Sequence, residues 1–114
     1  MRRPLLVPLL LALPAAAQVP AIDGRRVFER TCAPCHGQGP GNDGSLMLPA
    51  TAALDAKYHG QPPAALERRD DLEPEVLRAL VRNGQGAMPS FRKTEITDPE
   101  IDAVAAYLKR SAQR

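Results

Sequence analysis

Residues 32–36 read Cys32-Ala33-Pro34-Cys35-His36, two cysteines three positions apart with a histidine directly after the second. The chain of 114 residues contains only these two cysteines. Cys-x-x-Cys-His is the attachment signature of c-type haem, in which each thiol bonds one vinyl group of the same porphyrin. The histidine is then held beneath the iron as its proximal ligand. The motif therefore predicts one covalently bound haem, with Cys32 and Cys35 as attachment sites and His36 as an iron ligand.

Two other kinds of site use a Cys-x-x-Cys pair. A zinc site needs four ligands, so it would take both cysteines and both histidines of the chain, at spacings unlike those of known zinc sites. A thioredoxin-like dithiol needs a strand–helix–strand context, and no segment has a convincing strand pattern. Haem attachment is favoured because it also agrees with an export signal and a small apolar core.

The first 17 residues are typical of a secretory signal peptide. Arg2 and Arg3 supply the positive start, residues 5–13 the apolar centre, and Ala15-Ala16-Ala17 an A-x-A cleavage site before Gln18. The apolar run is short and rich in proline, whereas crossing a bilayer takes about 20 residues; an uncleaved anchor is the alternative. We expect a signal peptide at 1–17, a periplasmic domain at 18–114 and no membrane span after cleavage.

Cleavage would also change the charge of the protein. The whole chain carries a formal net charge of +2, and loss of Arg2 and Arg3 lowers the number of basic residues from 15 to 13, against 13 acidic residues. The side chains of the mature domain then sum to about zero, and two haem propionates would make it acidic. This balance argues against a nucleic-acid-binding protein, which needs a basic surface.

The mature domain has few residues with which to build a core. Aromatic residues make up 4% of the chain and tryptophan is absent, and domains of this size usually need a covalent or cofactor staple. A disulfide between Cys32 and Cys35 would close almost no loop and would stabilise little. A covalently held haem is a large apolar body around which short helices can pack.

Apolar periodicity predicts an all-helical domain. Asp23 is the expected N-cap of the first helix, Gly84 ends a later helix, and either Thr97 or Asp98 caps the last one. The glycine-rich residues 37–44 and residues 85–94 are expected to be loops. The expected helices cover residues 24–31, 50–58, 74–83 and the C-terminal segment from about 97–99, with one or two helical turns within 64–69.

Met88 is the candidate for the second axial ligand of the iron. It follows His36 by 52 residues and lies in a rigid segment of glycines and proline, Gly84-Gln85-Gly86-Ala87-Met88-Pro89. A thioether opposite a histidine raises the reduction potential of a haem and closes the iron to substrates. The competing interpretation is an ordinary core methionine. Of the rival ligands, Met47 is expected to pack against the porphyrin and His59 to be a surface residue.

The mature segment resembles the class I c-type cytochromes, a family of all-α proteins with one haem and crossed N- and C-terminal helices. The likeness lies in Gly24-x-x-x-Phe28 before Cys32-x-x-Cys35-His36-Gly37, in Val81-Arg82-Asn83-Gly84 before Met88-Pro89-x-Phe91, and in Ala106-Tyr107-Leu108. The resemblance implies that Gly24 lets the crossing helices approach and that Phe28 and Tyr107 pack there. It also implies that a proline carbonyl, that of Pro40 or that of Pro49, accepts a hydrogen bond from Nδ1 of His36.

The family resemblance implies a periplasmic electron-transfer protein with no catalytic residues. We expect a haem c ligated by His36 and Met88 to carry one electron at a time from a dehydrogenase to a terminal acceptor. A peroxidase-like haem enzyme with an open iron site is the alternative, and a secreted helical module without haem is a third interpretation. A narrower likeness, in residues 66–72 and 81–91, is to cytochrome subunits or partners of exported dehydrogenases of the cresol methylhydroxylase type.

A run of charged residues lies within the segment 66–72. Arg68 and Arg69 are followed at once by Asp70 and Asp71. The two arginines could pair with the haem propionates, or the whole run could form a solvated turn, which is the commoner role of such a run.

Overall fold

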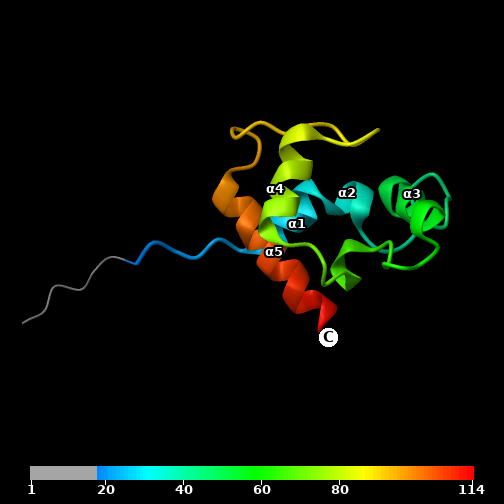
Figure 1. Cartoon of the computed structure of the whole chain (residues 1–114), viewed down its shortest axis with the longest axis horizontal. Coiled ribbons are helices and arrows are strands. Elements are labelled where there is room, and N and C mark those ends of the chain that lie inside the picture. The colour runs from blue at the N-terminus through cyan, green and yellow to red at the C-terminus, as the bar shows by residue number, and fades with distance from the viewer. Residues whose placement is uncertain (1–17) are drawn as a thin grey trace, which may run out of the picture.

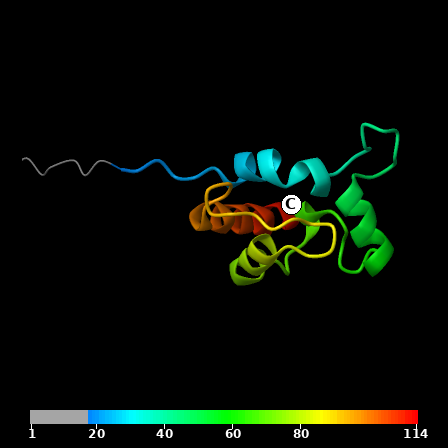
Figure 2. The ribbon, with the colours of Figure 1, turned by 90° about the horizontal axis from the view of Figure 1, so that it is seen from above.

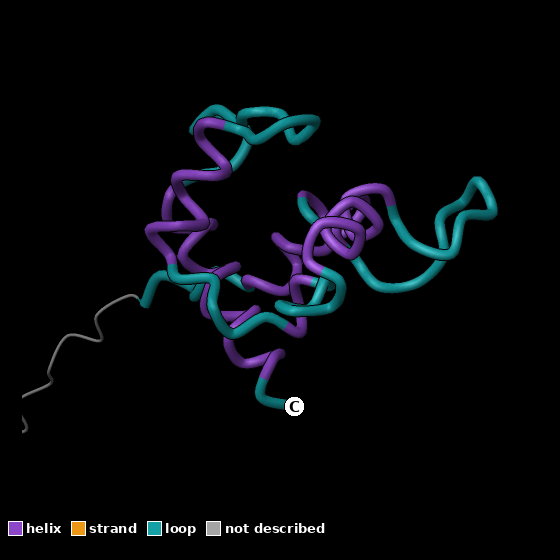
Figure 3. Tube along the Cα trace, turned by 45° about the vertical axis from the view of Figure 1, so that its right-hand side comes forward, coloured by secondary structure: helices purple, strands orange, loops and turns teal. Residues whose placement is uncertain are grey.

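The computed structural model describes residues 18–114, and over these residues it contains helices and loops without a strand (Figures 1 and 3). The predicted all-α fold is therefore confirmed. The predicted signal peptide lies outside the described residues, and no helix of the described part is long and apolar enough to cross a membrane. The elements are α1 (Gly24–Thr31), α2 (Ala33–His36), α3 (Pro49–Tyr58), the 3-10 turn η1 (Leu66–Arg68), α4 (Pro74–Asn83) and α5 (Asp98–Ala112).

The caps of the first and last helices follow from short polar side chains. The carboxylate of Asp23 accepts hydrogen bonds from the first backbone N–H groups of α1, as predicted. At the start of α5, Thr97 and Glu100 form a reciprocal capping box, in which Thr97 N–H donates to Glu100 at 2.8 Å and Glu100 N–H donates to Thr97 at 3.3 Å. Thr97, rather than Asp98, is therefore the cap of the last helix.

The first helix ends at Thr31 as predicted, but the short helical turn that follows it in the cysteine motif was not predicted. Helix α1 ends at Thr31, Cys32 joins the two segments, and the single turn of α2 follows with Pro34 near its start. Proline has no N–H to continue the hydrogen bonds of α1 but fits the first turn of a new helix. Four of the five residues of the motif consequently form a helical turn of their own, for which Cys32 is the N-cap.

Helices α1 and α5 cross in close contact, as the family resemblance implied (Figure 2). A Cβ at Gly24 would lie 1.9 Å from the carbonyl oxygen of Ala103, so only glycine permits this backbone approach. Beside the contact, the rings of Phe28 and Tyr107 pack at a tilt with their centroids 5.6 Å apart. The expected roles of Gly24, Phe28 and Tyr107 are confirmed by this geometry.

The core grows outward from this crossing. Helices α4 and α5 pack side by side, and η1 contacts α5 (Figures 1 and 2). The buried apolar cluster thus joins four elements and one loop residue, with Ile101, Val104 and Leu108 of α5 almost completely buried. Its members are Val27, Phe28, Leu66, Leu77, Val81, Ile96, Ile101, Val104, Ala105, Tyr107 and Leu108.

A polar bridge connects the crossing to the loop after the cysteine motif. The hydroxyl of Tyr107 donates to the carboxylate of Glu67 in η1, and the side-chain amide of Gln38 donates to the other oxygen of that carboxylate at 3.2 Å. Burial and the contact with Glu67 raise the pKa of Tyr107, so the phenol remains a donor. One carboxylate therefore links α5, η1 and the segment that follows His36.

Replacing Gly24 by alanine tests the crossing. The added methyl group collides with backbone that belongs to another helix, so we expect Gly24→Ala to lower the free energy of unfolding by about 3 kcal/mol, the upper part of the usual range for overpacking. Denaturant unfolding of the haem-loaded protein measures the change. Gly41→Ala is the control, because a Cβ there meets only side-chain atoms of Ser45 and Asp43. Equal effects of the two substitutions would contradict the account of the crossing.

Candidate functional site

A cavity of about 730 Å³ opens among α2, α3, α4 and the loop that connects α4 to α5. Its volume lies within the range of about 300–1,000 Å³ that is usual for ligand and cofactor sites. Most of its wall is apolar, with leucines of α3 and α4 among the lining side chains. All four residues that the sequence nominated for the site line this one cavity: Cys32, Cys35, His36 and Met88.

The two cysteines sit at the start and within the single turn of α2. Cys35 N–H donates to the carbonyl of Cys32 at 3.1 Å, and neither cysteine is in a disulfide. Burial raises the pKa of the Cys32 thiol to about 11, so the free thiol is neutral near pH 7. Among residues 18–114, no three side chains of His, Cys, Asp or Glu come together as a metal site. The geometry therefore disfavours the zinc interpretation.

His36 presents a neutral imidazole to the cavity. Burial lowers its pKa, which favours the uncharged ring with a free nitrogen lone pair. Its Nδ1 atom is buried and has no hydrogen-bond partner, a situation that calls for an explanation in a folded protein. Neither of the two expected acceptors, the carbonyls of Pro40 and Pro49, is bonded to this nitrogen.

The backbone directly after His36 is fixed by α3. The buried hydroxyl of Thr51 donates to the carbonyl of Gly37 at 2.9 Å. A Cβ at Gly37 would lie 2.7 Å from the carbonyl oxygen of Ala33, so the turn that leaves α2 requires glycine here. Thr51 was not singled out from the sequence, because a threonine inside a weak helical pattern carries no signal of its distant partner.

Met88 reaches the cavity from a tight turn. The backbones of Gln85 and Met88 exchange two hydrogen bonds, of 3.1 and 3.0 Å. Gly84 enters the turn with a φ of 68°, and a Cβ on it would lie 2.6 Å from the carbonyl oxygen of Met88. The predicted glycine stop at the end of α4 therefore also shapes the segment that holds Met88, whose side chain packs against the core cluster.

The rival ligands lie elsewhere. Met47 is 39% exposed and lines a second cavity of about 270 Å³, not the larger one. Met47 therefore does not line the cavity that holds the motif, contrary to the expectation that it packs against the porphyrin. His59 is exposed, in the left-handed conformation that ends α3, and lines neither cavity, in agreement with its assignment to the surface.

Comparison with known proteins places this site in a family. Residues 20–108 match the family model described as cytochrome c oxidase, cbb3-type, subunit III. The chain belongs to the class I c-type cytochromes. It is 34% identical to cytochrome c6 of Cyanidioschyzon merolae over 91 residues. The aligned segment covers 80% of this chain and 74% of that protein. Over 94 residues it is 34% identical to cytochrome c6 of Leptolyngbya boryana, covering 82% and 95% of the two chains.

The family assignment identifies the cofactor as one covalently bound haem c with its iron, and the function class as electron transport. A helical module without haem is thereby excluded. The residues at the cavity fit such a group: two thiols on one helical turn, a neutral imidazole, a thioether and an apolar wall. When bound, the haem supplies a one-electron couple at its iron.

The cytochrome also has one well-shielded arginine at the cavity wall. The side chain of Arg69 is 11% exposed and donates two hydrogen bonds to Asp71, of 2.9 and 2.6 Å. Its guanidinium lies 5.7 Å from the ring centre of Tyr58, and all three residues line the cavity. Hydrogen bonding between Arg69 and Asp71 raises the pKa of Arg69 and lowers that of Asp71. For Arg69 the solvated-turn interpretation is therefore wrong, whereas Arg68 is exposed.

Proposed function

We propose that this cytochrome is an exported one-electron carrier in which Cys32 and Cys35 hold haem c and His36 and Met88 ligate its iron. One observation carries the proposal: the four side chains line the same cavity, although Met88 is 52 residues from the motif in the chain. Imidazole and thioether together are the axial pair of the cytochromes c, which raises the reduction potential.

The roles of the protein side chains follow from this assignment. The apolar wall would keep water from the iron of a bound haem, and the thioether of Met88 would hold the iron in place of a substrate. Electron transfer through such a site needs no acid, base or nucleophile from the protein. The peroxidase-like alternative requires Met88 to be away from the iron, so the two functions differ in one observable bond.

Substitution of Met88 tests the axial assignment. In oxidised haem-loaded protein, a methionine–iron bond gives a weak charge-transfer band at the red edge of the visible spectrum. We expect Met88→Ala to abolish this band and to lower the reduction potential, because the thioether favours the reduced iron. Met47→Ala is the matched control and should leave both unchanged. An unaltered spectrum and potential in Met88→Ala would rule out His/Met ligation.

Export is proposed from residues 1–17, whose charged start, apolar centre and A-x-A site suit a cleaved signal peptide. The intact mass of the protein purified from both the periplasmic and the membrane fraction of a host with a cytochrome maturation system tests this. We expect a chain that begins at Gln18 and carries the mass of one haem after denaturation. A chain that retains residues 1–17 would support the uncleaved anchor instead.

The electron donor is proposed to be an exported dehydrogenase, of the cresol methylhydroxylase type in the narrowest form of the hypothesis. The support is the sequence likeness of residues 66–72 and 81–91 to cytochrome partners of such enzymes. Stopped-flow mixing of the oxidised cytochrome with a substrate-reduced flavoprotein dehydrogenase from the same organism provides the test. Fast reduction that saturates with cytochrome concentration is expected, whereas a rate no greater than that of free reduced flavin would contradict the donor assignment.

A further inference from the structure

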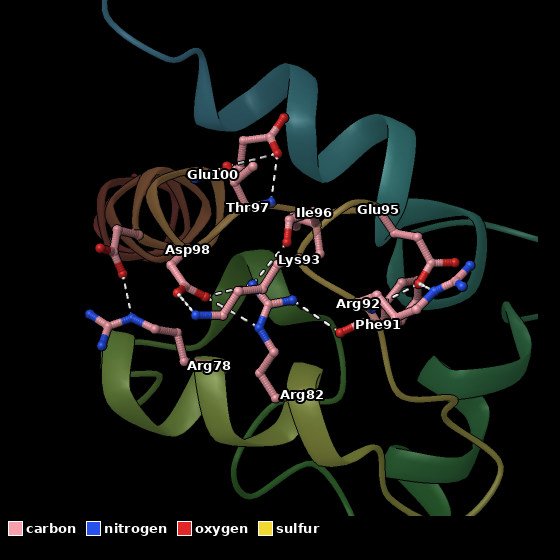
Figure 4. Close-up of polar contacts among 11 residues, drawn as sticks. Arg78, Arg82, Phe91, Arg92, Lys93, Glu95, Ile96, Thr97, Asp98 and Glu100 are labelled. Carbon is pink, nitrogen blue, oxygen red and sulfur yellow. Dashed lines mark hydrogen bonds and ion pairs between the residues drawn. The ribbon is translucent and has the colours of Figure 1, made fainter.

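The loop of residues 84–97, which carries Met88 between α4 and α5, is held by one side chain of α4. Nη1 of Arg82 donates to the carbonyl of Phe91 at 3.0 Å, and Nη2 donates to the carbonyl of Ile96 at 2.8 Å (Figure 4). The side chain of Arg82 is 20% exposed, so water competes weakly for these bonds. A single guanidinium thus fastens two separate points of the loop to the last turn of α4.

The guanidinium is itself fixed by Asp98, the first residue of α5. Nη2 and Nε of Arg82 lie 2.5 and 3.2 Å from Oδ1 of Asp98, and the amino group of Lys93 lies 3.0 Å from Oδ2 (Figure 4). Arg82 is therefore a three-way junction of α4, the loop and α5.

The position of this junction along the loop matters for Met88. The N–H of Phe91 donates to the carbonyl of Val81 at 2.8 Å, while the carbonyl of Phe91 accepts from Arg82. Both backbone groups of Phe91 are thus bound to the end of α4, three residues after Met88. The other end of the Met88 turn leaves α4 at Gly84. The turn is consequently closed at both ends. Among the described hydrogen bonds that join Phe91 to α4, the one from Arg82 is the only one that a side chain makes.

We propose that Arg82 is a positioning residue for Met88, which keeps the 84–97 loop closed and the thioether in the cavity. The inference rests on the proposed function, in which Met88 is an iron ligand. A planar guanidinium can serve two carbonyls and a carboxylate at once, and lysine cannot. Without Arg82, two loop carbonyls lose charge-assisted donors, so the open form of the loop becomes more populated.

Competition with imidazole measures the population of the open loop. Added imidazole can bind the oxidised iron only when Met88 has left, so its apparent Kd is inversely proportional to the fraction of open molecules. Titration of haem-loaded Arg82→Gln should give an apparent Kd about tenfold lower than that of the wild type, because charge-assisted hydrogen bonds are lost. Met88→Ala, in which the position is always open, sets the lower limit of Kd.

Arg78 provides the matched control. It lies one turn earlier on α4 and bonds Asp102 of α5 at 2.8 Å, and its described contacts do not include the 84–97 loop. Arg78→Gln therefore removes an arginine–aspartate bond between the same two helices, and we expect an unchanged apparent Kd. Denaturant unfolding of both variants measures their global stability. If Arg82 had a merely structural role, Arg82→Gln would lower this stability without a selective effect on imidazole binding.

Arg82→Lys covers the case in which Arg82→Gln does not fold. Lysine keeps the charge opposite Asp98 but lacks the fork for the two carbonyls, so imidazole affinity between those of the wild type and Met88→Ala is expected. Wild-type affinity in Arg82→Lys, or equal affinities in Arg82→Gln and Arg78→Gln, would overturn the proposal. A different pattern marks failure of the proposed function: Met88→Ala would then keep the charge-transfer band and bind imidazole no tighter than the wild type, which overturns both.

Discussion

The close contact of α1 with α5 is the constraint on which the rest of the structure depends. It exists because Gly24 has no side chain where the backbone of Ala103 passes. Packing of Phe28 on Tyr107 fixes the crossing, and with it the place of α1, which leads directly into the cysteine motif. Tyr107 extends the same contact through Glu67 to η1 and to the loop after the motif.

The cavity wall explains how so small a domain can be stable. Its helices bury their apolar faces against one another only in part, and further apolar side chains line the cavity, where a porphyrin would cover them. Val76 is 48% exposed and Leu80 partly buried, and both line the cavity from α4. The cofactor is therefore part of the core as well as the redox group, which agrees with the scarcity of aromatic residues in the chain.

Features that depend on neighbouring residues could be predicted from the sequence. The haem motif, the Asp23 cap, the glycine end of α4 and the loop position of Met88 all follow from short patterns. Features that depend on long-range packing could not: the burial of Arg69, the bond from Thr51 to the carbonyl of Gly37, and the bonds from Arg82 to the loop each join segments that no local pattern connects. The short turn α2 was missed because Pro34 was read within the motif rather than as a residue of the first turn of a helix.

The central claim is that Met88 completes the coordination of the iron, and the proton NMR spectrum of the reduced haem-loaded protein tests it most directly. A methyl group bonded through sulfur to the iron lies over the porphyrin and is shifted far upfield by the ring current. Only Met47 and Met88 occur in residues 18–114, so selective methyl labelling of methionine with single substitutions assigns the signal. One far-upfield methyl resonance, lost in Met88→Leu and kept in Met47→Leu, is the predicted result. Its absence from the wild type, or its loss in Met47→Leu alone, would contradict the account.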